Sequence, residues 1–370
     1  MKEYAPYYFS IYWWAVMLLT ISKYSSMQSL RGYAIIPQRD DYKPIIVFSV
    51  FFILFFGFRP VSNLFGDTIV YSSTYNLLQT YGTFDVEGTT SAGGDWLFFT
   101  FMAMCAQTID VHYFFFIVMY FYVVMMFNGC KKLDYRHGAT LMLFCIGAFS
   151  FYVYAINGIR NGVACSFVIL ALAGVCKGER TWPIILSFIA IGCHKSTALP
   201  LAAMFFTYFV KNPKLMYAAW LGAIALSLVF GEAIGNMMSL ISYDERLASN
   251  LNEDDADGLV LEHNFRWDFL LYCAMPILLG WYAIFKRKVY NHTYLILLGT
   301  YIYANAFWVL AIRAMFSNRI AYLSWFIYPI VLAYPLLNLP VFKKNHSKKT
   351  AWILLAHFGF TTIMWMLGKL

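Results

Sequence analysis

Long apolar stretches follow one another from residue 7 to residue 368, and short polar connectors separate them. About 20 consecutive apolar residues cross the hydrocarbon core of a membrane as an α-helix. The pattern therefore predicts an all-α polytopic integral membrane protein, with about twelve transmembrane helices in a single domain over residues 1–370. The predicted spans are residues 7–22, 44–58, 111–129, 139–156, 159–176, 181–194, 197–210, 215–231, 267–285, 293–311, 320–338 and 351–368.

The composition leaves no room for a soluble domain. Charged residues make up 12% of the chain, about half the share found in an average soluble domain. The net charge of +8 is divided among short basic runs between the apolar stretches, without the clustered basic face that binds nucleic acid. The N-terminal residues carry no cleavage signature, so we expect the first apolar stretch to be retained as a span.

The basic connectors predict the orientation of the chain, because lysine and arginine concentrate on the cytoplasmic side of a membrane. With these connectors inside, the other polar connectors share the opposite, outer face. The basic connectors contain Lys131, Lys132 and Arg136; Lys177 and Arg180; Lys211 and Lys214; Lys286, Arg287 and Lys288; and Lys343, Lys344, Lys348 and Lys349.

One apolar stretch does not fit this alternation. The span 44–58 ends outside and the span 111–129 must start outside, so residues 95–110 cannot cross completely. We predict a re-entrant or interfacial helix there, because the stretch is also short for a crossing. Two outer loops are long: residues 59–95, where we expect an amphipathic helix, and the acidic residues 232–266.

Four arginines, Arg59, Arg160, Arg313 and Arg319, stand at the predicted outer ends of apolar segments. A guanidinium group is permanently charged and binds phosphate through two parallel hydrogen bonds. At a helix centre each would cost about 2.5–3.5 kcal/mol. Four such groups on one face favour an anionic ligand, and Arg160 also has polar neighbours such as Asn157. The alternative for each arginine is that its side chain extends to the lipid headgroups.

The segment HKSTALP places His194 and Lys195 inside an apolar run, with Pro200 shortly after them. We predict a break between two helices, since irregular backbone at membrane depth is tolerated where it lines a wet cavity. A neutral imidazole there can take a proton from a sugar hydroxyl or bind a phosphate. The alternative is a hydrogen bond between two helices.

Two carboxylates lie beside glycines in the first outer loop, Asp67 in GDTIVY and Asp95 in GGDWLF. Either could orient an arginine, bind a sugar hydroxyl or act as a base, and the alternative is that each caps the following helix. The sequence contains no Walker A, GxSxG or HExxH motif and no paired Cys/His cluster. ATP hydrolysis and zinc chemistry are therefore not expected, and we interpret the seven cysteines as packing residues.

Five motifs stand in order on this many-helix background. They are FGFRPVSNLFGDTIVY (56–71), GGDW (93–96), NGIRNGVA (157–164), HKSTA (194–198) and SNRIAY (317–322). Together they resemble the EpsG family of Wzy-like polysaccharide polymerases. Two positions depart from the family pattern: Asp95 stands directly before Trp96, where a glutamate ahead of the glycine-aromatic pair would be expected, and Asn161 stands where glutamine commonly follows the arginine.

The resemblance implies a membrane-embedded glycosyltransferase with a GT-C-like architecture. Such enzymes use undecaprenyl-diphosphate-linked oligosaccharides on the outer side of the bacterial cytoplasmic membrane, and they transfer the growing glycan from its lipid diphosphate to an acceptor repeat unit. A flippase and a chain-length regulator of the same pathway are the expected partners. No metal or other cofactor is expected.

The candidate polar residues suit the transfer of a glycan from a lipid diphosphate. Arginines stabilise the negative charge of the departing lipid diphosphate, and a base that deprotonates the acceptor hydroxyl favours inversion at the anomeric carbon. We predict His194 as the base, with Asp67 as the competing candidate. The predicted diphosphate ligands are Arg160 and Arg319, followed by Arg59 and Arg313. The predicted substrate-binding residues are Tyr71, Asp95, Trp96, Asn157 and Lys195.

Two other functions remain open. An O-antigen-ligase-like transferase would use the same donor with a different acceptor, and the sequence does not separate it from a polymerase. A transporter or flippase of lipid-linked oligosaccharides would place polar groups on both faces and often shows internal repeats. Here the polar motifs share one predicted face and no repeat is visible.

Overall fold

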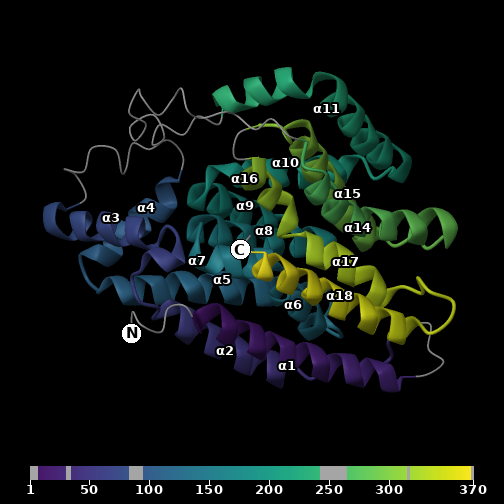
Figure 1. Ribbon diagram of the computed structural model, residues 1–370, viewed down its shortest axis with the longest axis horizontal. Helices are drawn as coiled ribbons and strands as arrows, with labels where there is room; N and C mark the ends of the chain where they lie inside the picture. The colour runs from purple at the N-terminus through teal and green to yellow at the C-terminus, as the bar shows by residue number, and fades with distance from the viewer. Residues whose placement is uncertain (1–6, 31–34, 83–94, 242–264, 315–316, 368–370) are drawn as a thin grey trace.

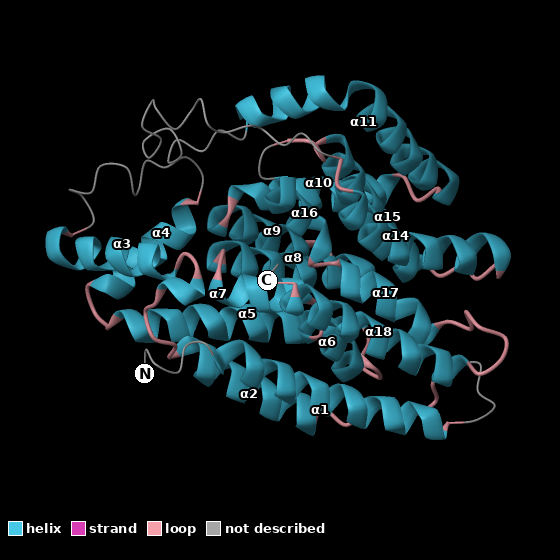
Figure 2. Ribbon diagram, viewed as in Figure 1, coloured by secondary structure: helices cyan, strands magenta, loops and turns pink. Residues whose placement is uncertain are grey.

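The protein is described by a computed structural model, which covers residues 7–30, 35–82, 95–241, 265–314 and 317–367. All regular structure in these residues is helical, and none of them forms a strand (Figure 2). The helices are α1 (Tyr8–Ser29), α2 (Lys43–Gly57), η2 (Asn63–Phe65), α3 (Thr68–Tyr81), α4 (Trp96–Ala106), α5 (Val111–Leu133), α6 (Gly138–Ile146), α7 (Phe149–Ile156), α8 (Ile159–Cys176), α9 (Thr181–Cys193), η3 (Lys195–Thr197), α10 (Ala198–Phe209), α11 (Pro213–Ile241), α14 (Trp267–Trp281), η4 (Tyr282–Lys286), α15 (His292–Leu310), α16 (Ser317–Trp325), α17 (Tyr328–Asn338) and α18 (His346–Met366).

Six helical stretches in the described part of the chain are long and apolar enough to cross a membrane, and a seventh is added if one bent pair counts as a single span. This confirms an all-helical protein with several candidate membrane spans. Every range predicted as a span is helical over most of its length, but the number of twelve crossings and the GT-C-like architecture stay predictions. The six stretches are Val111–Leu133, Ile159–Cys176, Pro213–Gly231, Trp267–Lys286, His292–Leu310 and Ser317–Asn338.

Two predicted spans are each built from two helices. The range 139–156 divides into α6 and α7, which are bent by 69°. The range 320–338 divides into α16 and α17, and Pro329 lies in the first turn of α17. A proline has no backbone N–H and its ring clashes with the carbonyl one turn earlier, so a single helix cannot pass through this position undisturbed.

The two outer loops and the short apolar stretch also have helical parts. Residues 95–110 contain α4, whose 11 residues are too few for a crossing. The first loop contains α3, and residues 83–94 lie outside the described residues. The helix α11 has 29 residues, about 43 Å at 1.5 Å per residue, so it continues through residues 232–241 of the predicted second loop. The acidic residues 242–264 lie outside the described residues.

The helices pack as an elongated bundle in which α1, α2 and α5 run side by side, with α3 and α4 at one end (Figure 1). The helix α8 is almost completely buried and packs against α5 and α9, while α15 packs against α10 and α11. The C-terminal helix α18 returns along α1. The helices α1 and α2 run in opposite directions, since Tyr8 contacts Phe56 and Tyr12 contacts Phe48. The helices α8 and α9 do so too, since Gly174 near the end of α8 lies against Pro183 near the start of α9.

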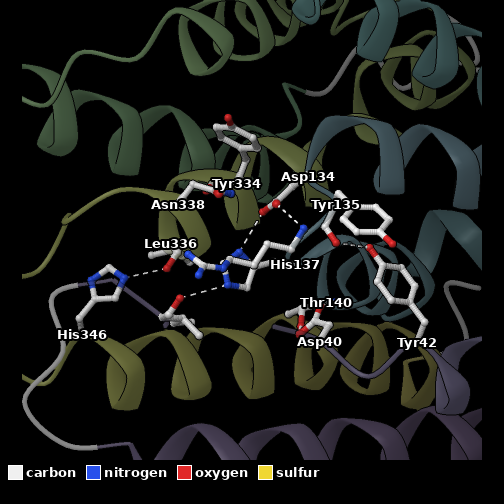
Figure 3. A network of polar contacts seen from close by, with 12 residues as sticks. Asp40, Tyr42, Asp134, Tyr135, His137, Thr140, Tyr334, Leu336, Asn338 and His346 are labelled. Carbon is white, nitrogen blue, oxygen red and sulfur yellow. Dashed lines mark hydrogen bonds and ion pairs between the residues drawn. The ribbon is translucent and has the colours of Figure 1, made fainter. Parts of the chain in front are cut away.

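A buried polar network joins several connectors at the predicted cytoplasmic end (Figure 3). His137, only 1% exposed, contacts Asp134 through Nδ1 at 3.0 Å and the carbonyl oxygen of Ile36 through Nε2 at 3.1 Å. Asp40 accepts hydrogen bonds from the backbone N–H and the hydroxyl of Thr140 at 2.7 and 2.9 Å. The network fastens the segment after α1 to the turn between α5 and α6.

Candidate active site

Asp95 is the centre of a polar cluster at the opposite end of the bundle. It stands directly before α4, and the whole residue is only 5% exposed. Its Oδ2 accepts hydrogen bonds from Arg160 Nη1 at 2.5 Å and from His194 Nδ1 at 2.9 Å. Its Oδ1 accepts from the backbone N–H of Lys195 at 2.9 Å. One carboxylate thus brings together the GGDW, NGIRNG and HKST motifs.

Arg160 lies in the first turn of α8 and is held from two sides. Its Nε donates to the hydroxyl of Tyr71 at 2.9 Å, while its Nη1 is bound by Asp95. The guanidinium carbon is 5.2 Å from the ring centre of Phe99 and 5.7 Å from that of Tyr71. These contacts orient the guanidinium group, and they add the GDTIVY motif to the cluster through Tyr71.

His194 forms the break between α9 and η3 that the sequence predicts. Its backbone is extended, with φ −157° and ψ 116°, which turns the chain before α10. Its Nδ1 faces Asp95, and its Nε2 lies 3.3 Å from the hydroxyl oxygen of Ser196. An ionised carboxylate can only accept hydrogen bonds, so Nδ1 carries the proton and Nε2 has the lone pair of a potential base.

The charge state of Asp95 follows from its surroundings. Burial raises the pKa of this carboxyl group, whereas the hydrogen bond from His194, the positive charge of Arg160 and the backbone hydrogen bond from Lys195 lower it. The lowering causes prevail, and the pKa lies below its usual value. Asp95 is therefore ionised near neutral pH and fixes the orientation of both His194 and Arg160.

Several helix N-termini meet at this cluster. Tyr71 lies in the first turn of α3, Asp95 precedes α4, Arg160 lies in the first turn of α8, and His194 precedes η3 and α10. The N-terminus of a helix carries partial positive charge and unpaired N–H groups, which favour anions. The arrangement suits a phosphate group, and the individual motifs of the sequence do not indicate this contribution of the backbone.

Three further predicted substrate-binding residues border the cluster. Trp96, next to Asp95, is 61% exposed. Lys195 is exposed on η3. Asn157 follows the last residue of α7, and a Cβ atom added to Gly66 would lie only 2.7 Å from the Cγ atom of Asn157. Since Gly66 also has φ +52°, the close approach and the backbone conformation both require glycine at this position.

The predicted diphosphate ligands Arg319 and Arg313 lie outside the polar cluster around Asp95. Arg319 is exposed in the first turn of α16, a helix that contacts η3 and α10. Arg313 lies between α15 and α16, and its guanidinium carbon is 5.9 Å from the ring centre of Phe265. Arg319 thus lies on a helix that borders the cluster, whereas the side chain of Arg313 lies against Gly231 of α11 and near Phe265.

Two predicted residues occupy positions with other surroundings. Asp67 is exposed at the start of α3, and its carboxylate has no contact with Asp95, Arg160 or His194 in the described residues. The structure therefore does not place this competing base beside the arginine. Arg59 is completely enclosed, 0% exposed, and contacts protein groups, so we leave it out of the proposed diphosphate site.

Ser196 belongs to the cluster although the sequence did not mark it as a site residue. The motif HKSTA contains it, but only the extended backbone at His194 brings its hydroxyl to Nε2. The Asp95 cluster thus consists of Tyr71, Asp95, Arg160, His194 and Ser196. The described residues contain no group of three or more His, Cys, Asp or Glu side chains that could hold a metal ion.

A protein-family model described as the EpsG family matches residues 44–369. The match includes all five motifs and every residue of the Asp95 cluster. No curated protein and no solved structure matches the chain.

Proposed function

The chain belongs to the EpsG family, and from this membership and the Asp95 cluster we propose that it polymerises lipid-diphosphate-linked oligosaccharides. The growing glycan is transferred from its undecaprenyl diphosphate to the acceptor repeat unit, on the outer face of the bacterial cytoplasmic membrane. A flippase that supplies the repeat units and a regulator of chain length are the proposed partners.

One observation carries the proposal: a single carboxylate oxygen of Asp95 binds both Arg160 and His194. A group that can accept a proton and a group that can stabilise a phosphate are thereby held next to each other. Glycosyl transfer from a lipid diphosphate needs both, because the acceptor hydroxyl loses a proton while the diphosphate gains negative charge.

In the proposed reaction, Nε2 of His194 takes the proton from the acceptor hydroxyl. The hydroxyl oxygen attacks the anomeric carbon of the donor glycan as the bond from that carbon to the diphosphate oxygen breaks. Asp95 accepts the hydrogen bond from Nδ1–H and stabilises the imidazolium ion. Attack opposite the leaving group gives inversion, and the imidazolium releases its proton to water afterwards.

The diphosphate leaves with the electron pair of the broken bond. Arg160 and the N-termini of the surrounding helices meet this charge, and Arg319 on the bordering helix adds a second cation. The step is proposed to be metal-independent, since fixed positive groups stabilise the leaving group. Trp96 offers an aromatic face for a sugar ring next to the reacting groups, and Lys195 and Asn157 offer polar contacts to the substrates.

The test uses the purified protein in lipid nanodiscs with lipid-linked repeat units from the source bacterium. The wild type is expected to form products that grow by one repeat unit at a time, resolved by gel electrophoresis and mass spectrometry. Arg160→Lys keeps the charge but loses the planar fork, and we expect a loss of rate of about 10²-fold or more. His194→Gln is expected to lose about 10²–10⁴-fold.

Other products would assign another function. A single addition onto a different glycolipid identifies a ligase. Movement of lipid-linked oligosaccharide across sealed vesicles, without any new glycosidic bond, identifies a transporter. Asp67→Asn serves as the control, because Asp67 lies outside the Asp95 cluster and its substitution should leave the rate near that of the wild type.

A further inference from the structure

Arg59 follows α2 and has an unusual environment for a cation. Its side chain is 0% exposed, and it forms no ion pair in the described residues. Its Nη1 donates to the carbonyl oxygen of Phe56 at 2.8 Å, and its Nε donates to the hydroxyl oxygen of Thr68 at 3.2 Å. The guanidinium carbon lies 4.7 Å from the ring centre of Phe115. A buried cation without a carboxylate needs another source of stabilisation.

The ends of three helices surround this cation: one contacts the guanidinium group directly, and the other two contact it through the hydroxyl of Thr68. Phe56 lies in the last turn of α2, and the hydroxyl of Thr68 contacts the carbonyl oxygens of Phe65 and Ile156, at 2.9 and 3.4 Å. Phe65 is the last residue of η2 and Ile156 is the last residue of α7. Helix C-termini carry partial negative charge and unpaired carbonyl oxygens, so a cation at their junction is favourable.

Two chain segments connect this junction to the candidate active site. Ile156 is followed by the turn at Asn157 and Gly158, where φ is +74° at the glycine, and then by α8 with Arg160 in its first turn. Thr68 starts α3, the helix whose Tyr71 accepts the hydrogen bond from Arg160 Nε. Arg59 and Thr68 are thus connected to both the backbone that carries Arg160 and the helix that orients its guanidinium group.

We propose that Arg59 is a positioning residue rather than a ligand of the diphosphate. Together with Thr68 it joins the C-terminal ends of α2, η2 and α7. This junction holds Arg160 in the position in which its guanidinium group binds Asp95. The expected effect of this junction on catalysis rests on the proposed function, but its expected effect on the backbone of residues 157–162 does not.

The first experiment needs no activity. Hydrogen–deuterium exchange of the protein in nanodiscs is measured for Arg59→Lys and Thr68→Val, which remove the Nε donor and the hydroxyl. Both are expected to raise the exchange rate of the amides at residues 158–162 about tenfold, with exchange in α15 and α18 unchanged. The matched control is Thr300→Val, a completely buried threonine in α15 whose hydroxyl has no partner in the described residues. Unchanged exchange in Thr68→Val would overturn the proposal even if Arg59→Lys does not fold.

The second experiment separates positioning from ligand binding. Farnesyl diphosphate serves as the lipid-diphosphate probe in calorimetric titrations. The affinity of Arg59→Lys for this probe should stay within about twofold of the wild-type value, while its elongation rate should fall about tenfold. The double variant with Thr68→Val should be no slower than Arg59→Lys, because both substitutions disrupt the same junction. If Arg59→Lys weakens the binding of the probe as much as Arg160→Lys does, Arg59 is a ligand of the diphosphate and the proposal is wrong. If the wild type neither elongates nor binds the probe, the proposed function fails, and the exchange result alone decides the role of Arg59.

Discussion

Asp95 combines two roles: it pairs with the arginine of one helix and orients the histidine at the start of another. Its third contact, with the backbone N–H of Lys195, fixes the break in which that histidine lies. Because all three partners are donors, Asp95 must stay ionised for the cluster to keep its form. The cluster should therefore respond to pH through this residue.

The first prediction concerns the stability of the Asp95 cluster as a function of pH. The folded protein has a depressed pKa at Asp95, so the contribution to stability is complete above the unfolded value of about 3.9 and disappears as the pH falls through the folded pKa. Between pH 5 and 7 the wild type should be about 1–3 kcal/mol more stable than Asp95→Asn. The difference in thermal midpoint, measured in detergent, should shrink below about pH 4. A difference that stays constant down to pH 3 would contradict this assignment.

The second prediction distinguishes the role of Ser196 in the reaction from that of His194. The hydroxyl of Ser196 lies 3.3 Å from Nε2, at the place where the acceptor hydroxyl must donate its hydrogen bond in the proposed reaction. Ser196 therefore occupies a position that the substrate takes over, and Ser196→Ala should keep the elongation rate within about fivefold of the wild type. His194→Gln, measured in the same assay, should lose about 10²-fold or more. Equal losses would mean that the serine hydroxyl itself takes part.

Residue chemistry alone indicated part of the cluster. Arg160 and His194 stand out in the sequence because permanent or titratable charge in an apolar run requires an explanation. The pairing of both with Asp95 does not follow from the sequence, since it depends on how α4, α8 and η3 pack. For the same reason Asp67 looked equivalent to Asp95, although one is exposed and the other buried.

At the scale of the helices, the hydrophobic pattern predicted the elements well and their interruptions poorly. Ranges such as 159–176 coincide with α8 because apolar composition and length are local properties. The bend between α6 and α7 escaped prediction, since both halves are apolar and no proline marks it. Pro329 explains the break before α17. From the sequence, however, an apolar run with one proline is equally compatible with a single kinked helix.

The third prediction concerns the polar network that fastens the connectors at the predicted cytoplasmic end (Figure 3). His137→Leu removes both hydrogen bonds of the imidazole and leaves buried polar groups without a partner, which should cost about 1–3 kcal/mol. The thermal midpoint should fall, while the elongation rate of the folded fraction stays the same because the Asp95 cluster lies at the other end. His112→Leu on α5, a half-exposed histidine, is the control and should change stability by at most about 0.5 kcal/mol. A slower enzyme with an unchanged midpoint would show that the network affects the site.

At the scale of the whole molecule, the alternating direction of the helices explains why residues far apart in the chain meet. The helices whose first turns or preceding residues form the Asp95 cluster start at the same end of the bundle, so Arg160 meets Tyr71 and Asp95, and His194 binds the same Asp95. The alternation could be derived from the sequence, because it needs only the order of spans and connectors. The rotation of each helix about its axis decides which side chains touch, and that rotation is set by packing throughout the bundle.

The last prediction tests this two-ended organisation in the membrane. If the basic connectors are cytoplasmic, Lys344 and Asn63 lie on opposite sides, because Asn63 belongs to the segment that carries Asp67 and α3. All seven native cysteines are buried, so a single introduced cysteine at an exposed position can be labelled with little background. A membrane-impermeant thiol reagent should modify Asn63→Cys on intact spheroplasts and Lys344→Cys only after permeabilisation. Labelling of both from the same side would place the Asp95 cluster and the basic connectors together, and a site for lipid diphosphates on the outer face would then be untenable.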